Sequence, residues 1–361
     1  MLKDSNIYNS FQGKKILITG HTGFKGSWLT CWLNNLGATV KGLSLNTQNS
    51  KDHFNLLKGN QICESIIHDI RDSDFVKKSI TKFKPDFIFH LAAQAIVIDS
   101  YNNPLDTIST NISGTSNVLN AARFLERPCT LILVTTDKVY DNNNEIKKFS
   151  EEDKLGGKDL YSASKSASEL IIEAFIHSFF HPDNYKIHGI KIGVARAGNV
   201  IGGGDRSNSR IMPDIINSLE KNISLNIRNP YSVRPWQHVL EPLSGYISMA
   251  HFLSNSSKTT TGLLNFGPKA NDLLSVKDLV DFAFKYWGKG SFEIKKFKDK
   301  PYEASFLQLD ISKAEDLIGW SPNYSSHEAI IKTLEWYKCS SANYFEYSSK
   351  QISEYTTHGF N

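Results

Sequence analysis

A glycine-rich turn between a strand-like and a helix-like segment constrains this chain more than any other feature. The sequence KILITGHTGFKGSWLTCWL starts with an apolar run, continues with Gly20, Gly23 and Gly26, and then has helix-forming residues. Glycines in this position permit a tight turn and let the backbone approach a pyrophosphate at the positive start of a helix. The spacing is G-x-x-G-x-x-G rather than G-x-G-x-x-G, so a plain tight turn remains the alternative to a dinucleotide site.

Short apolar runs alternate with longer amphipathic segments over the first two thirds of the chain. The runs are KILIT (15–19), ATVKGL (38–43), CESIIH (63–68), DFIFHLAA (86–93), TLILVTT (130–136) and IKIGVAR (190–196). Because these runs are apolar throughout, they predict a parallel sheet covered on both faces, with crossover helices over 73–83, 113–126 and 161–180. The predicted fold class is α/β, with a Rossmann-type doubly wound parallel sheet.

The texture of the sequence changes after residue 196, where Gly, Asn and Pro become frequent. Such composition indicates loops with short helices between them. We therefore expect a dinucleotide-binding Rossmann domain made of 1–196 and 238–267. A smaller, interleaved C-terminal substrate-binding lobe is expected over 197–237 and 268–361.

Bulk composition excludes several classes of protein. Lys and Arg number 41 and Asp and Glu 37, a net charge of +4 that is too small to indicate binding to nucleic acid or to an anionic membrane. The four cysteines form no C-x-x-C pair, which argues against disulfides and a metal site. No run resembles a signal peptide or a membrane span. A soluble cytoplasmic protein is expected.

The ends of the second and third strands bear on the identity of the dinucleotide. Ser44, Leu45 and Asn46 stand where an acidic residue would hold the adenosine ribose of NAD, but no arginine stands there to bind a 2′-phosphate, so NAD is favoured over NADP. Asp69 and Ile70 are expected at the adenine edge, with a helix N-cap as the alternative for Asp69.

A Tyr-x-x-x-Lys motif opens the predicted helix over 161–180. Tyr161 and Lys165 share one face of a helix, so the ammonium can lower the pKa of the phenol and make Tyr161 a base. Thr136, at the end of the fifth strand, completes a Thr–Tyr–Lys set. This order is typical of the short-chain dehydrogenase/reductase superfamily.

Several longer blocks carry a more specific resemblance. They are GHTGFKGSWL, TTDKVYDN, YSASK, RAGNVIGGGD, RNPYSVRPWQHVLEPLSGY and LNFGP, and together they resemble the CDP-glucose 4,6-dehydratases, extended members of that superfamily. The resemblance covers nearly the whole chain. It implies bound NAD, the nucleotide sugar CDP-glucose as substrate, and a role in deoxysugar synthesis such as that for lipopolysaccharide O-antigen.

The resemblance also implies a reaction and its catalytic residues. The family oxidises the sugar at C4, eliminates water across C5 and C6 and returns hydride to C6. Tyr161 would take the proton of the C4 hydroxyl, Thr136 would hydrogen-bond that hydroxyl, and Lys165 would hold the nicotinamide ribose. Asp137 would protonate the leaving C6 hydroxyl.

Lys138 follows Asp137 where related dTDP-glucose dehydratases have a glutamate base. We expect Lys138 to remove the C5 proton, for which it must be neutral at that moment. A structural ion pair between Asp137 and Lys138 is the alternative.

Further site residues follow from the same resemblance. The cofactor contacts expected from it and from the glycine loop are Gly20, Thr22, Gly23, Phe24, Lys25, Gly26, Asp69, Ile70, Leu91, Ala92, Ala93, Gln94, Asn111, Thr135, Tyr161 and Lys165. The expected substrate contacts are Gln94, Asn199, Arg210, Arg234, Gln237, Tyr302 and Glu303. Arg234 has the planar fork that suits a pyrophosphate, whereas Arg196 either joins the site or only supports its loop.

Three residues depart from the family pattern: Ile98 and Asp99, near an expected arginine, and Arg206, where an aromatic residue is common. They leave open a preference for another nucleotide hexose. A nucleotide-sugar 4-epimerase is the second alternative, although it has no need of an acid and base at 137 and 138. A non-catalytic sensor would have little reason to keep Tyr161 and Lys165. A homodimer, formed as a four-helix bundle by the helices near 104–125 and 161–180, or a tetramer built from it, is expected.

Overall fold

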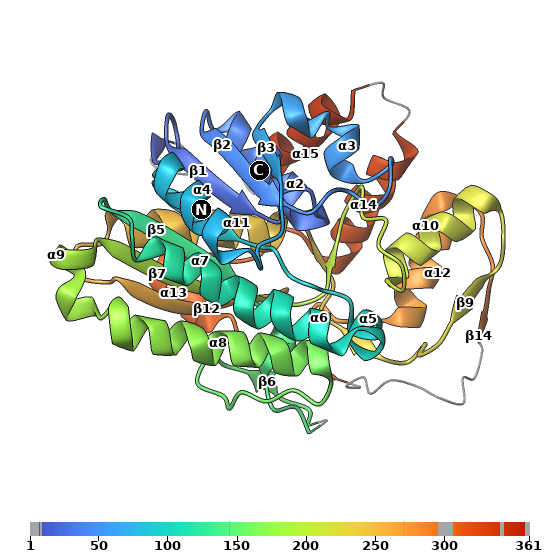
Figure 1. The fold of residues 1–361 in the computed structure, drawn as a ribbon. Helices are drawn as coiled ribbons and strands as arrows, with labels where there is room; N and C mark the ends of the chain where they lie inside the picture. The colour runs from blue at the N-terminus through green and yellow to red at the C-terminus, as the bar shows by residue number, and fades with distance from the viewer. Residues whose placement is uncertain are drawn as a thin grey trace.

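A parallel β-sheet forms the centre of the computed structural model, which describes residues 7, 9–143, 145–269, 271–294, 306–339 and 343–357 (Figure 1). Within these residues the sheet has seven strands in the order β12-β7-β5-β4-β1-β2-β3, each parallel to its neighbours. The strands are β1 (Lys15–Thr19), β2 (Thr39–Ser44), β3 (Glu64–Ile67), β4 (Phe87–His90), β5 (Cys129–Val134), β7 (Ile190–Ala197) and β12 (Thr261–Phe266). The order reverses between β1 and β4, which opens a crevice at the carboxyl ends of these strands. The predicted fold class is confirmed.

One face of the sheet is covered by helices that come from the first half of the chain (Figure 1). They are α4 (Ser73–Phe83), α5 (Val97–Asn102), α6 (Pro104–Ile108), the π-helical turn η2 (Ser109–Ser113), α7 (Gly114–Ala122) and α8 (Leu160–Phe179). The buried apolar residues of α4, α7 and α8 form one core with alternate residues of the strands, such as Leu17 and Leu131. No helix of the described ranges, α8 included, is long and apolar enough to cross a membrane.

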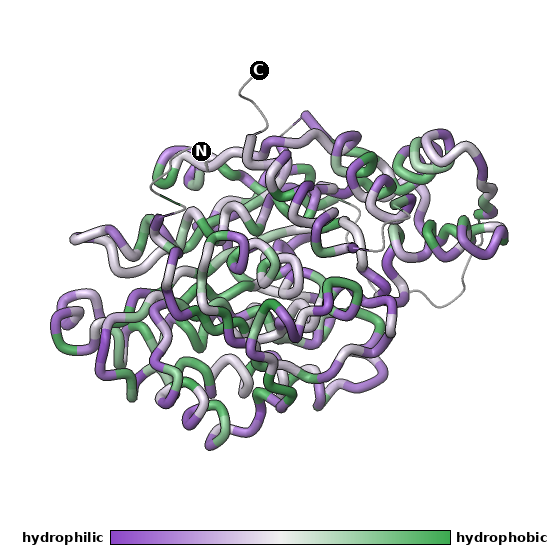
Figure 2. The backbone as a smooth tube through the Cα atoms, turned by 90° about the horizontal axis from the view of Figure 1, so that it is seen from above, coloured by the Kyte–Doolittle hydropathy of each residue, from purple (hydrophilic) through white to green (hydrophobic). Residues whose placement is uncertain are grey.

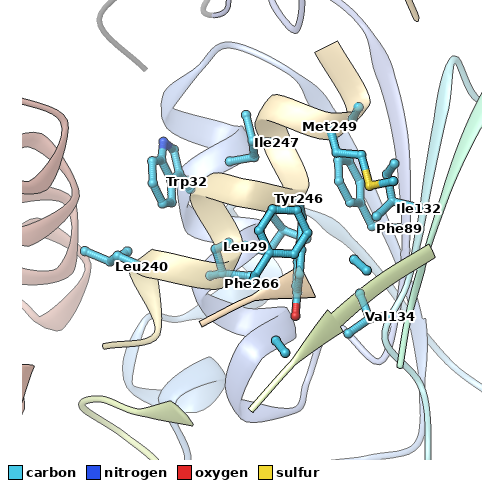
Figure 3. Packing of buried hydrophobic residues seen from close by; sticks show 14 of the residues in the cluster. Leu29, Trp32, Phe89, Ile132, Val134, Leu240, Tyr246, Ile247, Met249 and Phe266 are labelled. Carbon is cyan, nitrogen blue, oxygen red and sulfur yellow. The ribbon is translucent and has the colours of Figure 1, made fainter. Parts of the chain in front are cut away.

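The opposite face is covered by helices from both ends of the chain. They are α2 (Phe24–Asn35), α11 (Leu240–Asn255), α13 (Ser312–Ile318) and α15 (Tyr344–Thr357). Figure 3 shows Met249 of α11 beside Phe89 and Ile132, and Ile247 on the side of the helix where Trp32 lies; all five residues belong to one buried core. Residues on nearly every side of α11 are buried, so this helix is a core element and not an amphipathic cover.

A smaller cluster of helices lies beside the sheet, with its own apolar core (Figure 1). It contains α10 (Ile211–Lys221), β9 (Leu225–Ile227), α12 (Val276–Trp287), β14 (Phe292–Ile294) and α14 (Ser326–Lys338). Figure 2 shows hydrophobic and hydrophilic residues alternating along the helical turns, as expected for helices with one buried face.

Short elements connect these layers. They are α3 (His53–Leu56), η1 (Gly59–Gln61), η3 (Asp137–Val139), β6 (Lys148–Phe149), η4 (Pro182–Asn184), α9 (Tyr185–His188), β8 (Val200–Ile201), β10 (Val233–Arg234), β11 (Gln237–His238), β13 (Leu274–Ser275) and β15 (Gln308–Leu309). The 3-10 turn η3 and the strands β8, β10 and β11 contain or adjoin half of the predicted catalytic and substrate residues, namely Thr136, Asp137, Lys138, Asn199, Arg234 and Gln237. These residues therefore lie in connections held by the sheet rather than inside long elements.

Candidate active site

The glycine loop joins β1 to α2 at the crevice, and two of its glycines have no room for a side chain. Gly20 has φ +78°, and a Cβ there would lie 2.7 Å from the backbone nitrogen of Ala92. A Cβ on Gly26 would lie 2.0 Å from the carbonyl oxygen of Gly20. Gly23 caps α2 without a side-chain hydrogen bond, so the first N–H groups of the helix are available to an anion. This arrangement fits the pyrophosphate of NAD.

Thr22 connects this loop to the end of β2. Its hydroxyl donates to the carbonyl oxygen of Leu45 at 2.8 Å and lies 2.8 Å from the hydroxyl of Ser44. The end of β2 is therefore fixed by neutral hydroxyl groups, where many dinucleotide-binding proteins have a carboxylate. Phe24 and Lys25 follow at the start of α2.

Asp69 and Ile70 lie after β3, but the carboxylate of Asp69 is occupied. Arg71 donates to it at 2.5 and 2.9 Å and also pairs with Asp106, and this arginine holds the pKa of Asp69 below its usual value. The N-cap of α4 is Asp72, which accepts from the backbone of Phe75 at 3.0 Å. The N-cap alternative for Asp69 is therefore wrong.

Asn111, in the π-helical turn η2, joins the segment after β4 to helix α8. Its side chain accepts from the backbone N–H of Gln94 at 2.8 Å and donates to Ser164 at 2.8 Å. Leu91, Ala92 and Ala93 precede Gln94 along the same segment, whose backbone passes the glycine loop. The side-chain oxygen of Gln94 is buried and has no hydrogen-bond partner in the described part of the chain. A ligand in the crevice could supply that partner.

Helix α8 brings Tyr161 and Lys165 to the end of β5. The ammonium of Lys165 donates to the carbonyl oxygen of Val134 at 2.9 Å, and the hydroxyl of Thr136 lies close enough to the phenol of Tyr161 to act on its pKa. The set of Thr136, Tyr161 and Lys165 that the sequence predicted is thus assembled in one place.

The expected lowering of the pKa of Tyr161 is wrong for this structure. Burial raises the pKa of the phenol to about 12, and the hydroxyl of Thr136 only partly offsets this effect. Burial also lowers the pKa of Lys165 to about 8, against the attraction of Glu169. The prediction failed because it counted the charge of Lys165 and not the cost of desolvating both groups.

Asp137 is the least exposed acid of the site. Burial raises the pKa of its carboxyl, while Lys138, Thr136 and the nearby cations Arg234 and Lys25 act in the opposite direction. Thr136 donates to its Oδ1 at 3.0 Å, and its buried Oδ2 has no partner among the described residues. Burial of this kind favours the protonated form of the carboxyl, which can donate its proton to a bound group.

Gly198 explains why Asp137 has space on its free side. A Cβ at position 198 would lie 2.6 Å from Oδ2 of Asp137. The glycine in RAGNV therefore keeps the free carboxyl oxygen unobstructed, and sequence reasoning did not single it out. Lys138 is half-buried in the same turn, and its backbone N–H donates to Thr136.

The predicted substrate residues lie on short strands and loops next to this acid. Arg234 is buried on β10 and donates to the carbonyl oxygen of Val233 at 3.0 Å. Gln237 donates to the carbonyl oxygen of Phe266, and its own side-chain oxygen is buried without a partner in the described ranges. Asn199 lies beside Gln237: the backbone N–H of Gln237 donates to the backbone carbonyl oxygen of Asn199 at 3.1 Å.

Arg210 precedes α10 and pairs with the buried Asp205 at 3.1 Å. Its charge acts on Tyr161 and on Lys25, which places it near the catalytic groups. Tyr302 and Glu303, also predicted to contact the substrate, lie outside the described residues.

Arg206 and Arg196 are both engaged by glutamates. Arg206 forms two hydrogen bonds with Glu220, at 2.9 and 3.1 Å, so its charge is compensated away from the catalytic groups. Arg196 is paired with the buried Glu169. Of the two roles open to Arg196, the structure therefore shows support of the loop.

Lys25 lies deeper in the site than a simple phosphate contact would require. Its ammonium is 3.4 Å from the hydroxyl of Tyr246 on α11, and burial lowers its pKa to about 8. Tyr246 was not predicted as a site residue, because an aromatic residue in an apolar helix is normally expected to belong to the hydrophobic core. Glu169 was missed as well, although its place four residues after Lys165 on one helix face was a usable signal.

Comparisons with known proteins find relatives that cover most of the chain. The family model of GDP-mannose 4,6-dehydratase matches residues 17–333. The CDP-glucose 4,6-dehydratase of Salmonella typhimurium is 42% identical over 349 residues, covering 96% of this chain and 97% of that protein.

Two solved structures share the fold. One is UDP-glucuronic acid 4-epimerase of Bacillus cereus with UDP-glucuronic acid and NAD, with a TM-score of 0.76, 22% identity, and 90% and 99% of the two chains covered. The other is the dTDP-glucose 4,6-dehydratase of Streptomyces venezuelae with NAD bound, with a TM-score of 0.74, 21% identity, and 90% and 97% of the two chains covered.

Proposed function

The chain belongs to the CDP-glucose 4,6-dehydratase family, and from this premise we propose that it converts CDP-D-glucose to CDP-4-dehydro-6-deoxy-D-glucose and water. As a member of that family it is a nucleotide-sugar 4,6-dehydratase. The nucleotide, the hexose and the roles of individual residues are the content of the proposal.

The observation that carries the proposal is the state of Asp137. Its carboxyl is buried, its pKa is raised by that burial, and its Oδ2 has no partner in the described ranges. An epimerase needs the hydroxyl groups of Thr136 and Tyr161 but no acid beside them. A protonated carboxyl in this place supports elimination of a hydroxyl group from the sugar.

The family uses NAD, and the residues of this chain fit it. The two glycines without room for a Cβ, Gly20 and Gly26, and the uncapped start of α2 would hold its pyrophosphate, and Lys165 its nicotinamide ribose. Held by these residues, NAD would supply the hydride acceptor for C4 of the sugar and the hydride donor for C6. Asp69, already paired with Arg71, would contribute through its backbone or its remaining acceptor positions.

In the oxidation, Tyr161 accepts the proton of the C4 hydroxyl while Thr136 orients that hydroxyl by a hydrogen bond. The pKa of about 12 for the buried phenol means that Tyr161 must be deprotonated with help from its surroundings. Arg210 and Thr136 both favour the charged form of Tyr161.

In the elimination, Lys138 takes the C5 proton, which the C4 ketone has made acidic. Asp137 gives its proton to the C6 hydroxyl, the C6–O bond breaks, and water leaves. Lys138 returns its proton to C5 as C6 is reduced, and the proton that Tyr161 took from the C4 hydroxyl restores the acid form of Asp137, so the product differs from the substrate by one water.

Cationic and amide groups would hold the rest of the substrate. Arg234 and Arg210 would bind the pyrophosphate, for which a planar guanidinium is suited. Gln94, Asn199 and Gln237 would contact the sugar or the base, and Gln94 and Gln237 each have a buried side-chain oxygen without a partner in the described residues. Tyr302 and Glu303 keep their proposed substrate role.

The chain is also proposed to form a homodimer through α6, η2, α7 and α8. Leu105 on α6 is 77% exposed and Leu170 on α8 is 56% exposed. Apolar residues this exposed on adjoining helices suit a helix-to-helix interface. The proposal places the enzyme in the cytoplasm and keeps the division into a cofactor domain and a substrate lobe.

Product chemistry tests the proposal. The purified protein is incubated with CDP-glucose and NAD, and the ultraviolet absorbance of the mixture is read after addition of alkali. A 4-keto-6-deoxy sugar gives the absorbance and no net NADH accumulates. An epimerase gives no such absorbance, and a dehydrogenase gives NADH; either result contradicts the proposal.

A further inference from the structure

The segment that carries the acid and base, residues 135–140, is held at both of its ends. At one end the hydroxyl of Thr135 donates to Oε1 of Glu169 at 2.5 Å. At the other end the hydroxyl of Tyr140 accepts from Nη1 of Arg196 at 2.8 Å. The proposed chemical steps use none of these four side chains.

Glu169 and Arg196 join the two ends, because they form one ion pair. Nε of Arg196 lies 3.0 Å from each carboxylate oxygen of Glu169, and Nη2 lies 2.5 Å from one of them. The side chains are 5% and 2% exposed. A buried ion pair is weak support for stability, since apolar residues of similar size often do as well. The pair does, however, fix the orientation of the hydroxyl groups that hydrogen-bond to it, those of Thr135 and Tyr140.

Neighbouring contacts keep this pair in place. Tyr140 also donates to Oδ1 of Asn265 on β12 at 2.7 Å, so the far end is connected to the main sheet. Ser166 on α8 donates to the carbonyl oxygen of Val139 at 2.9 Å. The end of β5, α8, β7 and β12 therefore all contribute to fixing the segment.

In the middle of the segment, the carboxyl of Asp137 makes one hydrogen bond with another side chain among the described residues. Oδ1 of Asp137 accepts from Thr136, and Oδ2 has no partner in the described part of the chain. The direction of this carboxyl therefore depends on the backbone that carries it. A displacement of about 1 Å at a reacting group can cost a factor of roughly 100 in rate.

We infer that Glu169 and Arg196 are positioning residues, which hold positions 135 and 140 and so aim Thr136, Asp137 and Lys138 at the substrate. The inference deepens the proposed function and rests on it. A purely structural pair would affect stability alone. A positioning pair also sets the rate of the chemical steps.

Two isosteric variants test the inference. Thr135→Val and Tyr140→Phe each remove one hydroxyl while the Glu169–Arg196 pair stays complete, so no charge is left without its partner. The matched control is Thr333→Val on α14, which removes a fully buried hydroxyl that donates to Ala329 at 2.7 Å, far along the chain from the site.

The expected result is a kcat for CDP-glucose about 10-fold lower in both variants, with KM changed less than about 2-fold. The deuterium isotope effect with substrate labelled at C4 should rise in Thr135→Val, because Thr136 is adjacent. Thr333→Val should keep the kcat and isotope effect of the parent even if its melting temperature falls. Parental kcat and isotope effects in both site variants overturn the inference.

Activity of the parent separates the two claims. If the parent makes no ketosugar, the proposed function is wrong, and hydrogen–deuterium exchange of residues 135–140 decides the inference. Faster exchange of residues 135–140 in Thr135→Val and Tyr140→Phe, but not in Thr333→Val, supports the positioning role of Glu169 and Arg196. Unchanged exchange overturns it.

Discussion

Among single residues, Asp137 and Lys138, which follow Thr136, matter most to the proposed elimination. The sequence identified Asp137 and Lys138 by position, and the structure adds what position could not give: the burial of Asp137 and its unpaired Oδ2 within the described ranges. The surroundings of this carboxyl depend on residues distant in sequence, such as Gly198, which leaves Oδ2 unobstructed, and Arg234, whose charge opposes the effect of burial on the pKa of Asp137. For the same reason the sequence misjudged the direction of the pKa of Tyr161.

Replacing Asp137 by Asn should lower kcat by roughly 100-fold or more, because the leaving hydroxyl loses its acid. In the parent, activity should fall as pH rises through the raised pKa of Asp137, since only the protonated form donates. The pH dependence of kcat, measured in both proteins, checks this.

The pH dependence of the free energy of unfolding tests the raised pKa of Asp137 independently of activity. A buried acid with a raised pKa stabilises the fold in its protonated form, so this contribution is lost as pH rises from the ordinary value of 3.8 through the raised pKa. Asp137→Asn should escape that loss. Asp141→Asn is the control, and equal pH dependence of unfolding in all three proteins contradicts the assignment.

Lys138→Ala should stop exchange of the C5 hydrogen with solvent while oxidation at C4 continues. The reason is that the substitution removes the base and leaves Tyr161 and Thr136 in place. Mass analysis of substrate and product formed in deuterium oxide measures the exchange. Lys154→Ala, at a lysine 83% exposed on the surface, is the control. Normal exchange in Lys138→Ala means that another group is the base.

At the scale of elements, the chain was most predictable where a pattern is local. The segment KILIT is β1 and the predicted helix 73–83 is α4. The predicted helix 113–126 is α7, but a π-helical turn precedes it and carries Asn111. That turn was not predictable from the sequence, because Asn111 makes its side-chain hydrogen bonds with Gln94 and Ser164, which are distant along the chain.

The turn into α2 makes a testable prediction about cofactor binding. Gly26→Ala places a Cβ 2.0 Å from the carbonyl oxygen of Gly20, so the loop must shift. We expect a loss of about 2 kcal/mol in the free energy of unfolding and an NAD affinity at least 10-fold weaker. Thermal unfolding and NAD titration measure these effects.

Gly267→Ala is the matched control for that substitution, because its Cβ would make only ordinary contacts with Leu309 at 3.5 Å or more. Its stability and NAD affinity should remain near those of the parent. If Gly26→Ala also binds NAD normally, the glycine loop does not hold the pyrophosphate.

At the scale of the whole molecule, the contacts that complete the fold join distant parts of the chain. Helix α15 packs on α2, where the rings of Trp32 and Tyr355 meet at 5.8 Å, and Tyr355 donates to Glu241 on α11 at 2.7 Å. These pairings were not predictable from the sequence, since hydrophobic periodicity shows that a helix face is buried but not which element covers it. The family and the fold class were nevertheless identified correctly, because both follow from local motifs in a fixed order.

Leu170→Glu should convert the proposed dimer to a monomer, because it buries an unpaired charge in the interface of α8. Light scattering coupled to size exclusion measures the molar mass. Ile223→Glu, at a residue 52% exposed beside α10, should leave the mass unchanged. A dimer that persists in Leu170→Glu locates the interface elsewhere.

Substrate choice is measured by incubating the purified protein and NAD separately with the glucose or mannose derivatives of CDP, dTDP, GDP and UDP. The mass of each nucleotide sugar is followed with time. The account predicts loss of one water from CDP-glucose, much faster than from any other nucleotide hexose. No loss of water from CDP-glucose, or faster loss from another nucleotide hexose, would contradict it.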